Sequence, residues 1–101
     1  MSNPMDERGR SLEEEYFHRK NQEAIEKLRA IVKLAEMATA IELMAGAQAL
    51  EYHAPLAPGR GVKQAYEIVR SHVAPLTHDR AMAGDIDRIT AAIKNGEFRD
   101  L

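Results

Sequence analysis

The stretch Ser11–Tyr52, SLEEEYFHRKNQEAIEKLRAIVKLAEMATAIELMAGAQALEY, decides the fold. It contains no proline and one glycine, Gly46, and its apolar residues recur at helical spacing. Acidic and basic side chains also stand four residues apart in the order that stabilises a helix, as at Glu23 and Lys27. A serine followed three residues later by Glu14 is a capping box, so we expect a long helix that begins at Ser11.

Signals after this stretch predict shorter helices. Residues 53–61 contain two prolines and two glycines and should form a loop. The next helix should cover about 62–72, because Pro75 cannot continue it. Asp85 is a plausible N-cap for a last helix that stops at Gly96. Since no run alternates like a strand, the sequence predicts an all-α fold, a long N-terminal helix followed by two or three shorter helices.

Composition narrows the class of protein. The chain has 101 residues, 45% hydrophobic and 30% charged, with a net charge of −2 and no cysteine. The balanced charge does not indicate nucleic acid binding, and no apolar run approaches the roughly 20 residues of a membrane span. Without cysteines to suggest disulfides, we expect a cytoplasmic protein. Residues 1–10 are polar and should form a flexible tail.

The chain from about 33 to 98 resembles the C-terminal end of histidine ammonia-lyase and its aromatic amino acid relatives. Several blocks in series carry the resemblance: Leu34–Ala38, Ala40–Tyr52, Ala54–Gly61, Ala65–Leu76 and Asp79–Ile86. We therefore divide the chain into a tail at 1–10, a charged amphipathic helix at 11–32 and an ammonia-lyase-like helical segment at 33–101.

The resemblance implies a helical fold and a homotetrameric enzyme that eliminates ammonia from histidine, tyrosine or phenylalanine. The electrophile of that family forms from an Ala-Ser-Gly triplet, and no such triplet occurs among these 101 residues. We therefore assign no catalytic and no cofactor-binding residue. The four histidines have no metal-ligand spacing, so we assign no metal-binding residue either. We expect no activity from this chain alone.

The N-terminal third differs from that family. Residues 13–28 are weakly similar to the inhibitory helix of the mitochondrial ATP synthase inhibitor, which has an acidic run, Tyr-Phe and then an amphipathic stretch. An ordinary amphipathic helix explains the same residues. The candidate partner-binding residues of this helix are Leu12, Tyr16, Phe17, Ile25 and Leu28.

Two functional hypotheses follow. The first is a non-catalytic, structural lyase fragment that associates with a larger ammonia-lyase subunit or with itself, because its apolar residues exceed what two short helices can cover. The alternative is a helical binding or inhibitor module that acts through residues 11–36 in the manner of the ATPase inhibitor.

Overall fold

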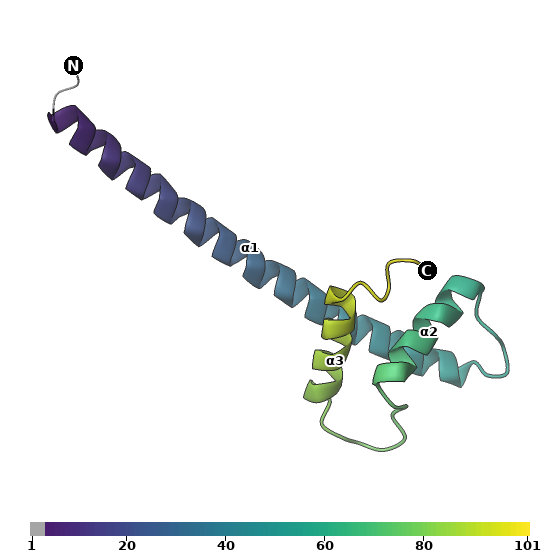
Figure 1. Cartoon of the computed structure of the whole chain (residues 1–101). Helices are drawn as coiled ribbons and strands as arrows, with labels where there is room; N and C mark the ends of the chain where they lie inside the picture. Colours follow the sequence, from purple (N-terminus) through teal and green to yellow (C-terminus); the bar gives the residue numbers. More distant parts are fainter. Residues whose placement is uncertain (1–3) are drawn as a thin grey trace. The chain divides into compact units, whose positions relative to one another are not determined.

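The computed structural model describes residues 4–101, and helices are the only regular secondary structure in that range. Figure 1 shows three of them: α1 (Pro4–Tyr52), α2 (Arg60–His72) and α3 (Ala83–Lys94). The all-α prediction with a long first helix is confirmed. The chain divides into an amino-terminal unit that ends at Lys33 and a carboxyl-terminal unit, Leu34–Leu101, and α1 contributes residues to both.

Helix α1 begins at Pro4, not at the predicted Ser11. Proline suits a first helical position because that position needs no N–H donor. Asp6 and Glu7 lie in the first turn, where negative charge interacts favourably with the helix dipole. Residues 4–10, which we expected in a tail, are therefore helical, and Ser11 lies inside the helix and does not cap it. Residues 1–3 of the expected tail lie outside the described residues.

The ends of the two shorter helices can be compared with the ends predicted from Pro75, Asp85 and Gly96. Helix α2 ends at His72, before Pro75, as predicted. Helix α3 ends in a Schellman motif: Gly96 has a φ of 77°, and the N–H of Glu97 donates to the carbonyl of Ala92 at 3.2 Å. The prediction of Asp85 as N-cap is wrong, because Met82 occupies that position without a side-chain cap.

The core of the carboxyl-terminal unit is small and is built where the last part of α1 meets α2 and α3. Helix α1 contributes two alanines, Ala40 and Ala47, together with Met44. The largest fully buried side chains are Val69 of α2 and Ile89 of α3. The buried cluster is formed by Ala40, Met44, Ala47, Val69, Val73 and Ile89.

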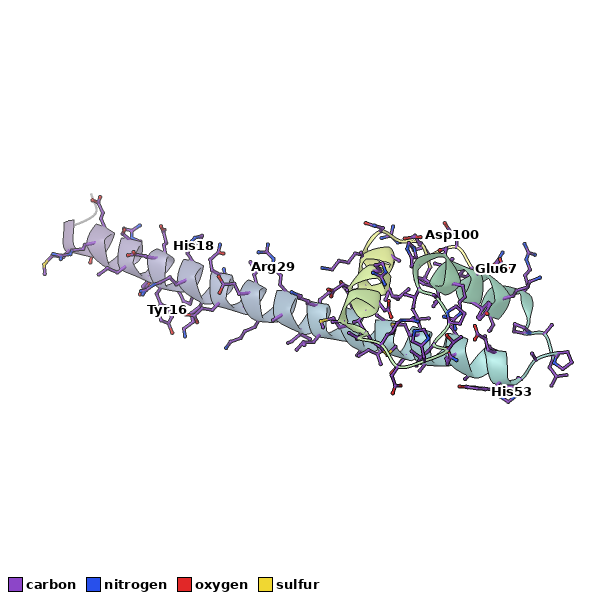
Figure 2. All side chains as sticks on the ribbon, turned by 90° about the horizontal axis from the view of Figure 1, so that it is seen from below. Tyr16, His18, Arg29, His53, Glu67 and Asp100 are labelled. Carbon is purple, nitrogen blue, oxygen red and sulfur yellow. The ribbon has the colours of Figure 1, made fainter. Side chains whose placement is uncertain are left out.

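The amino-terminal unit has no such core among its described residues. Every side chain from Met5 to Lys33 is exposed. Figure 2 shows these side chains projecting from the ribbon all around α1, with Tyr16 and His18 on opposite sides. Isolated helices are marginal in water because most helical stability in proteins comes from packing. The unit therefore offers apolar surface that packing within the chain does not bury.

Candidate docking site

A polar network ties the end of α1 to α2. Glu51 accepts hydrogen bonds from the Tyr66 hydroxyl and from Nε of Arg70, both at 2.8 Å, through the same carboxylate oxygen. The Arg70 guanidinium also lies 5.4 Å from the centre of the Tyr66 ring. These donors favour the charged carboxylate. The Tyr66 hydroxyl, assisted by Arg70, holds the pKa of Glu51 below its ordinary value of 4.5, against the opposing effect of burial.

Gln48 extends this network to the segment after α2. Its side-chain oxygen accepts the backbone N–H of Leu76 at 3.0 Å and a guanidinium N–H of Arg70 at 3.3 Å. Its amide nitrogen donates to the carbonyl of Leu76 at 3.4 Å. One side chain of α1 therefore satisfies both backbone groups of a loop residue, which holds the loop against the helix.

Asp85 organises the start of α3. This residue is only 4% exposed, and its two carboxylate oxygens accept from Nε of Arg80 at 3.1 Å and from a terminal nitrogen of Arg88. Arg80 also donates to the carbonyls of Ala74 and Pro75 at 2.6 and 3.0 Å. The carboxylate bonds to guanidinium groups instead of to helix N–H groups, which is why Asp85 does not cap α3.

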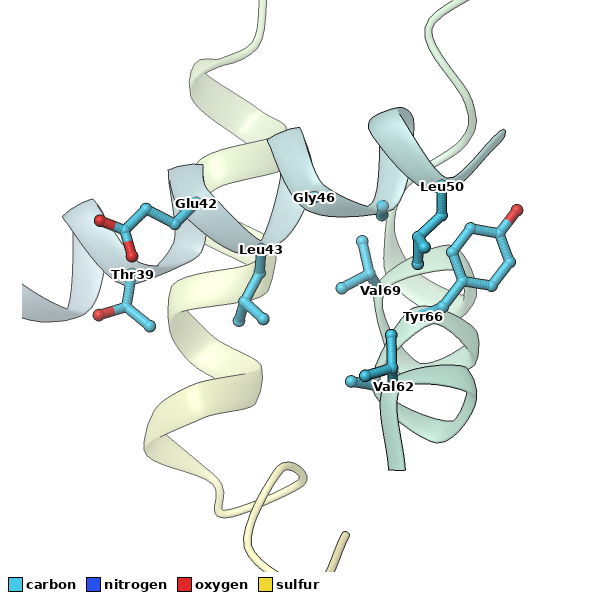
Figure 3. Close-up of a pocket in the computed structure, with 10 residues that line it drawn as sticks. Thr39, Glu42, Leu43, Gly46, Leu50, Val62, Tyr66 and Val69 are labelled. Carbon is cyan, nitrogen blue, oxygen red and sulfur yellow. The ribbon is translucent and has the colours of Figure 1, made fainter. Parts of the chain in front are cut away.

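An apolar groove lies between α1 and α2 on one side of this core. It has a volume of about 420 Å³ and is open to solvent. Figure 3 shows Leu43 and Leu50 of α1 and Val62 and Val69 of α2 pointing into the space between the helices. A Cβ on Gly46, which also lines the groove, would meet nothing within 4 Å. The α1–α2 groove can therefore receive a side chain or a helix from outside.

A second groove lies on another side of α1, next to α3 and the loop before it. It has a volume of about 340 Å³ and is lined by Ile41 and Met44 of α1, Met82 and Ile86 near α3, and Leu76 of the loop. Arg70 and Arg80 of the two polar networks also line it. The networks thus fix the elements that form the groove, while its lining stays mainly apolar.

The five predicted partner-binding residues are all exposed in the amino-terminal unit. At about 100° per residue, Leu12 and Tyr16 lie 40° apart on the helix, and Phe17 and Leu28 lie 20° apart. Leu12 and Leu28, however, are separated by about 160°. The helix therefore places the set on two faces. The Tyr16 and Phe17 rings meet edge to face with centroids 5.7 Å apart.

Metal sites and membrane-spanning helices are not evident in residues 4–101. That part of the chain has no group of three or more histidine, cysteine, aspartate or glutamate residues placed to hold a metal ion. Its helices include none that is both long enough and apolar enough to cross a membrane. Nε2 of His72 is hydrogen-bonded to a carboxylate oxygen of Glu97 at 2.8 Å, which joins the end of α2 to the C-terminal segment. Among the described residues, the two apolar grooves beside α1 are therefore the candidate sites.

The curated proteins that are most similar to this chain are histidine ammonia-lyases, and each matches about 70% of the chain. A histidine ammonia-lyase of Myxococcus xanthus is 39% identical over 70 residues, 69% of this chain. Those of Natranaerobius thermophilus and Symbiobacterium thermophilum are 40% and 38% identical over 72 and 75 residues. Most of this chain is similar to a segment of histidine ammonia-lyase. The resemblance predicted from the sequence is confirmed, and it is consistent with a fragment of that family.

The similarity covers a small part of those relatives. The chain spans 14% of the Myxococcus xanthus protein and 15% of the Symbiobacterium thermophilum protein. No protein-family model matches the chain. No solved structure matches it significantly. Since 70 aligned residues cannot fit into the amino-terminal unit, at least half of the match lies within residues 34–101, where the two grooves are.

Sequence reasoning did not find the grooves or the networks. Gln48 and Arg70 are 22 residues apart, and Glu51 and Tyr66 are 15 apart, so no local spacing joins them. The mild signal that could have pointed to the α1–α2 groove is Gly46 within a run of small residues of α1. Such a run predicts either close packing or an open surface, and only the fold decides between them.

Proposed function

We propose that this chain is a non-catalytic, ammonia-lyase-like helical segment that docks through residues 34–101 onto a larger histidine ammonia-lyase polypeptide. The observation that carries the proposal is the pair of open apolar grooves beside α1 in the unit that holds at least half of the lyase-like sequence. Contiguous exposed apolar surface marks interaction sites in proteins. The matched relatives are about seven times longer than the aligned stretch and so supply a partner of suitable chemistry.

The absence of catalytic function belongs to the same proposal. These 101 residues contain no Ala-Ser-Gly triplet, from which the electrophile of that family forms. Two grooves whose lining is mainly apolar bind another apolar surface better than they bind a small zwitterion such as histidine. We expect the chain to act in the cytoplasm.

A binding experiment tests the docking. We would coexpress this chain with the Myxococcus xanthus lyase, intact and with its matching segment removed, and measure the mass of the purified complex. We expect binding to the shortened lyase, because its surface for this segment is free. Val62→Lys places a charge at the α1–α2 groove, where Val62 is 53% exposed, and should abolish binding.

A matched control separates docking from general stickiness. Leu56→Lys alters a loop residue that is 76% exposed and does not line either groove, so it should bind normally. Equal binding by both variants, or none by the unaltered chain, would contradict the proposal. Incubation of the purified chain with histidine, phenylalanine and tyrosine tests the catalytic part, since formation of urocanate, cinnamate or coumarate would show activity.

Exposure of the amino-terminal helix supports a second candidate function. Phe17 and Leu28 are each 61% exposed and nearly aligned along α1, as in helices that bind an apolar groove. This candidate is an inhibitor-like module acting through residues 11–36. Titration into an ATP synthase catalytic sector, with Leu28→Ala as the weakened variant, tests it. Hydrolysis that stays unchanged at every pH would argue against an ATPase inhibitor.

A further inference from the structure

The second half of the amino-terminal unit has one apolar face. Residues 16–33 of α1 are all exposed, and at about 100° per residue seven of them fall within an arc of about 120°. Five of the seven are large apolar side chains, each between 40% and 61% exposed: Phe17, Ile25, Leu28, Ile31 and Val32. The other two are Asn21 and Ala24. We call these seven residues the Phe17–Val32 face, and none of them is charged.

Basic side chains stand on both edges of this face. Lys20 and Lys27 lie within about 40° of one edge, and Arg29 lies about 40° beyond the other. The two carboxylates of residues 16–33 belong to Glu23 and Glu26, which lie about 140° and 160° from the centre of the face. The edges of the face are therefore cationic, and the acidic side chains stand on the opposite side of the helix.

The basic side chains on the edges are accessible to a partner. Lys20 pairs with Glu23 at 3.7 Å, but both side chains are more than half exposed, and such a surface pair contributes little. Figure 2 shows Arg29 on the same side of α1 as His18, projecting away from the ribbon. Long aliphatic stems let lysine and arginine cover the edge of an apolar surface while their charges stay in polar surroundings.

This pattern fits the surface of an anionic lipid bilayer. A helix that lies in the membrane interface buries its apolar face at the boundary between headgroups and acyl chains, and its basic side chains are attracted to anionic headgroups. A bilayer covers the whole arc and both of its edges, whereas one partner helix in a coiled coil covers only a narrower stripe. The width of the Phe17–Val32 face and its two cationic edges therefore favour a lipid surface.

Asn21 distinguishes a bilayer from an apolar groove in a protein. Its side chain lies about 20° from the centre of the Phe17–Val32 face, so a partner that covers the face also covers this amide. In an apolar groove the amide would lose its hydrogen bonds with water, which costs free energy. The hydrated headgroups of a bilayer supply donors and acceptors at that depth, so a lipid surface accommodates Asn21 better.

The acidic part of α1 limits the contact. Residues 5–15 contain five acidic and two basic side chains, a net charge of −3, whereas residues 16–33 contain two acidic and five basic ones, a net charge of +3. Glu13 and Glu14 point in the same direction as the Phe17–Val32 face, so an anionic surface repels them. Contact with the bilayer should therefore begin after these two residues, and their carboxylates should weaken it.

We propose that residues 16–33 of α1 bind reversibly to anionic lipid bilayers, with the helix parallel to the surface and the Phe17–Val32 face turned toward the acyl chains. This attachment requires no membrane-spanning helix. With five large apolar side chains and a net charge of +3, binding should be weak and should decrease as salt is added. The attachment concerns the amino-terminal unit and does not depend on docking by residues 34–101.

Vesicle binding by the full-length chain tests the role of charge. We would measure cosedimentation with vesicles of phosphatidylcholine and phosphatidylglycerol in equal parts, and with vesicles of phosphatidylcholine alone. We expect binding to the mixed vesicles at low ionic strength and its loss at high salt. Lys20→Gln combined with Lys27→Gln should weaken binding about 25-fold, because each basic side chain near such a surface contributes about fivefold.

A matched pair of substitutions separates the cationic edge from net charge. Arg19→Gln combined with Lys33→Gln removes the same charge from the side opposite the Phe17–Val32 face, so binding should weaken less than about fivefold. Equal weakening by the two pairs, or equal binding to the two kinds of vesicle, would overturn the proposal. Glu13→Gln combined with Glu14→Gln should strengthen binding to the mixed vesicles, and weaker binding would contradict the repulsion.

A fluorescent label tests the orientation of the helix. The sequence has no cysteine, so an environment-sensitive fluorophore on Leu28→Cys or on Ala30→Cys reports one position. Position 28 lies at the centre of the Phe17–Val32 face, and position 30 lies about 160° away. Addition of the mixed vesicles should shift the emission to shorter wavelength at position 28 only. Equal shifts at both positions, or no shift at position 28, would refute this orientation.

Two further measurements separate the lipid surface from other partners. A synthetic helical peptide with a leucine face and glutamate on both edges represents an acidic protein. Binding of this peptide without any binding to vesicles would identify an acidic protein as the partner and overturn the proposal. Leu28→Glu should weaken vesicle binding at least about tenfold and leave docking onto a lyase unchanged, which separates failure of this proposal from failure of the proposed function.

Discussion

Removal of the Asp85 carboxylate should destabilise the carboxyl-terminal unit more than any other single change at a charged residue. Asp85→Ala leaves the Arg80 guanidinium, whose side chain is 26% exposed, without the anion that it contacts at 3.1 Å. Loss of one partner from a buried ion pair costs about 3–5 kcal/mol. The contact to Arg88 adds little, because that side chain is 55% exposed and a surface pair contributes at most about 1 kcal/mol. We therefore expect a loss of about 3 kcal/mol.

This loss is large for so small a unit. A unit of 68 residues has a free energy of unfolding of roughly 3–10 kcal/mol. Urea denaturation followed by near-ultraviolet circular dichroism reports on this unit, because Tyr66 is the one tyrosine among the described residues that is not exposed. Asp87→Ala is the matched control, since Asp87 lies on the same helix and is exposed. Asp85→Asn serves if the alanine variant does not fold, with a smaller loss.

The result that refutes the reasoning is a difference of less than about 0.5 kcal/mol between Asp85→Ala and Asp87→Ala, the ordinary scatter of surface substitutions. Such an outcome would mean that Arg80 finds equivalent partners in the carbonyls of Ala74 and Pro75. In that case the hydrogen bonds from Arg80 to these two carbonyls hold the loop before α3, and the Asp85 carboxylate adds little to the free energy of unfolding.

Three further substitutions test the remaining structural conclusions. The pKa of Glu51 is lowered on folding, chiefly by the Tyr66 hydroxyl. The contribution of Glu51 to stability is therefore complete above pH 4.5 and disappears as the pH falls through the lower pKa of the folded state. Glu51→Gln should remove this part of the pH dependence of the free energy of unfolding, measured by urea titrations. Gly46→Ala should raise the free energy of unfolding by about 0.5–1 kcal/mol, because the new methyl group meets open space on a helix; a lower midpoint in thermal denaturation would contradict this. Ile89→Ala should cost about 2–5 kcal/mol in the same assay, whereas Leu56→Ala should cost less than about 0.5 kcal/mol.

Local signals predicted the helices of this chain and most of their ends. Prolines and glycines separate the periodic segments, and Gly96 marks a Schellman stop that depends only on neighbouring residues. The start of α1 was missed because Pro4 and Gly9 indicate a tail when they are considered singly. In a helix that continues for many turns, however, a proline at the first position is favourable and one glycine costs only about 1 kcal/mol.

The errors at functional positions have a different origin. An aspartate before an apolar segment is a sequence signal for an N-cap, but Asp85 is bonded to two arginines, one of them five residues upstream. The contacts of Gln48 with Arg70 and Leu76 span 22 and 28 residues. Such pairings depend on the crossing of helices, which spacing along one helix does not specify.

The small core and the open grooves have a common cause. Helix α1 offers Ala40 and Ala47 to the core, but two alanines bury little apolar area. Polar contacts from Gln48, Glu51 and Asp85 then hold the elements in place where apolar packing is insufficient. The same small residues leave space beside the helices. A chain of this composition therefore has a defined helical frame and uncovered apolar surface at once, and this combination supports the docking that we propose.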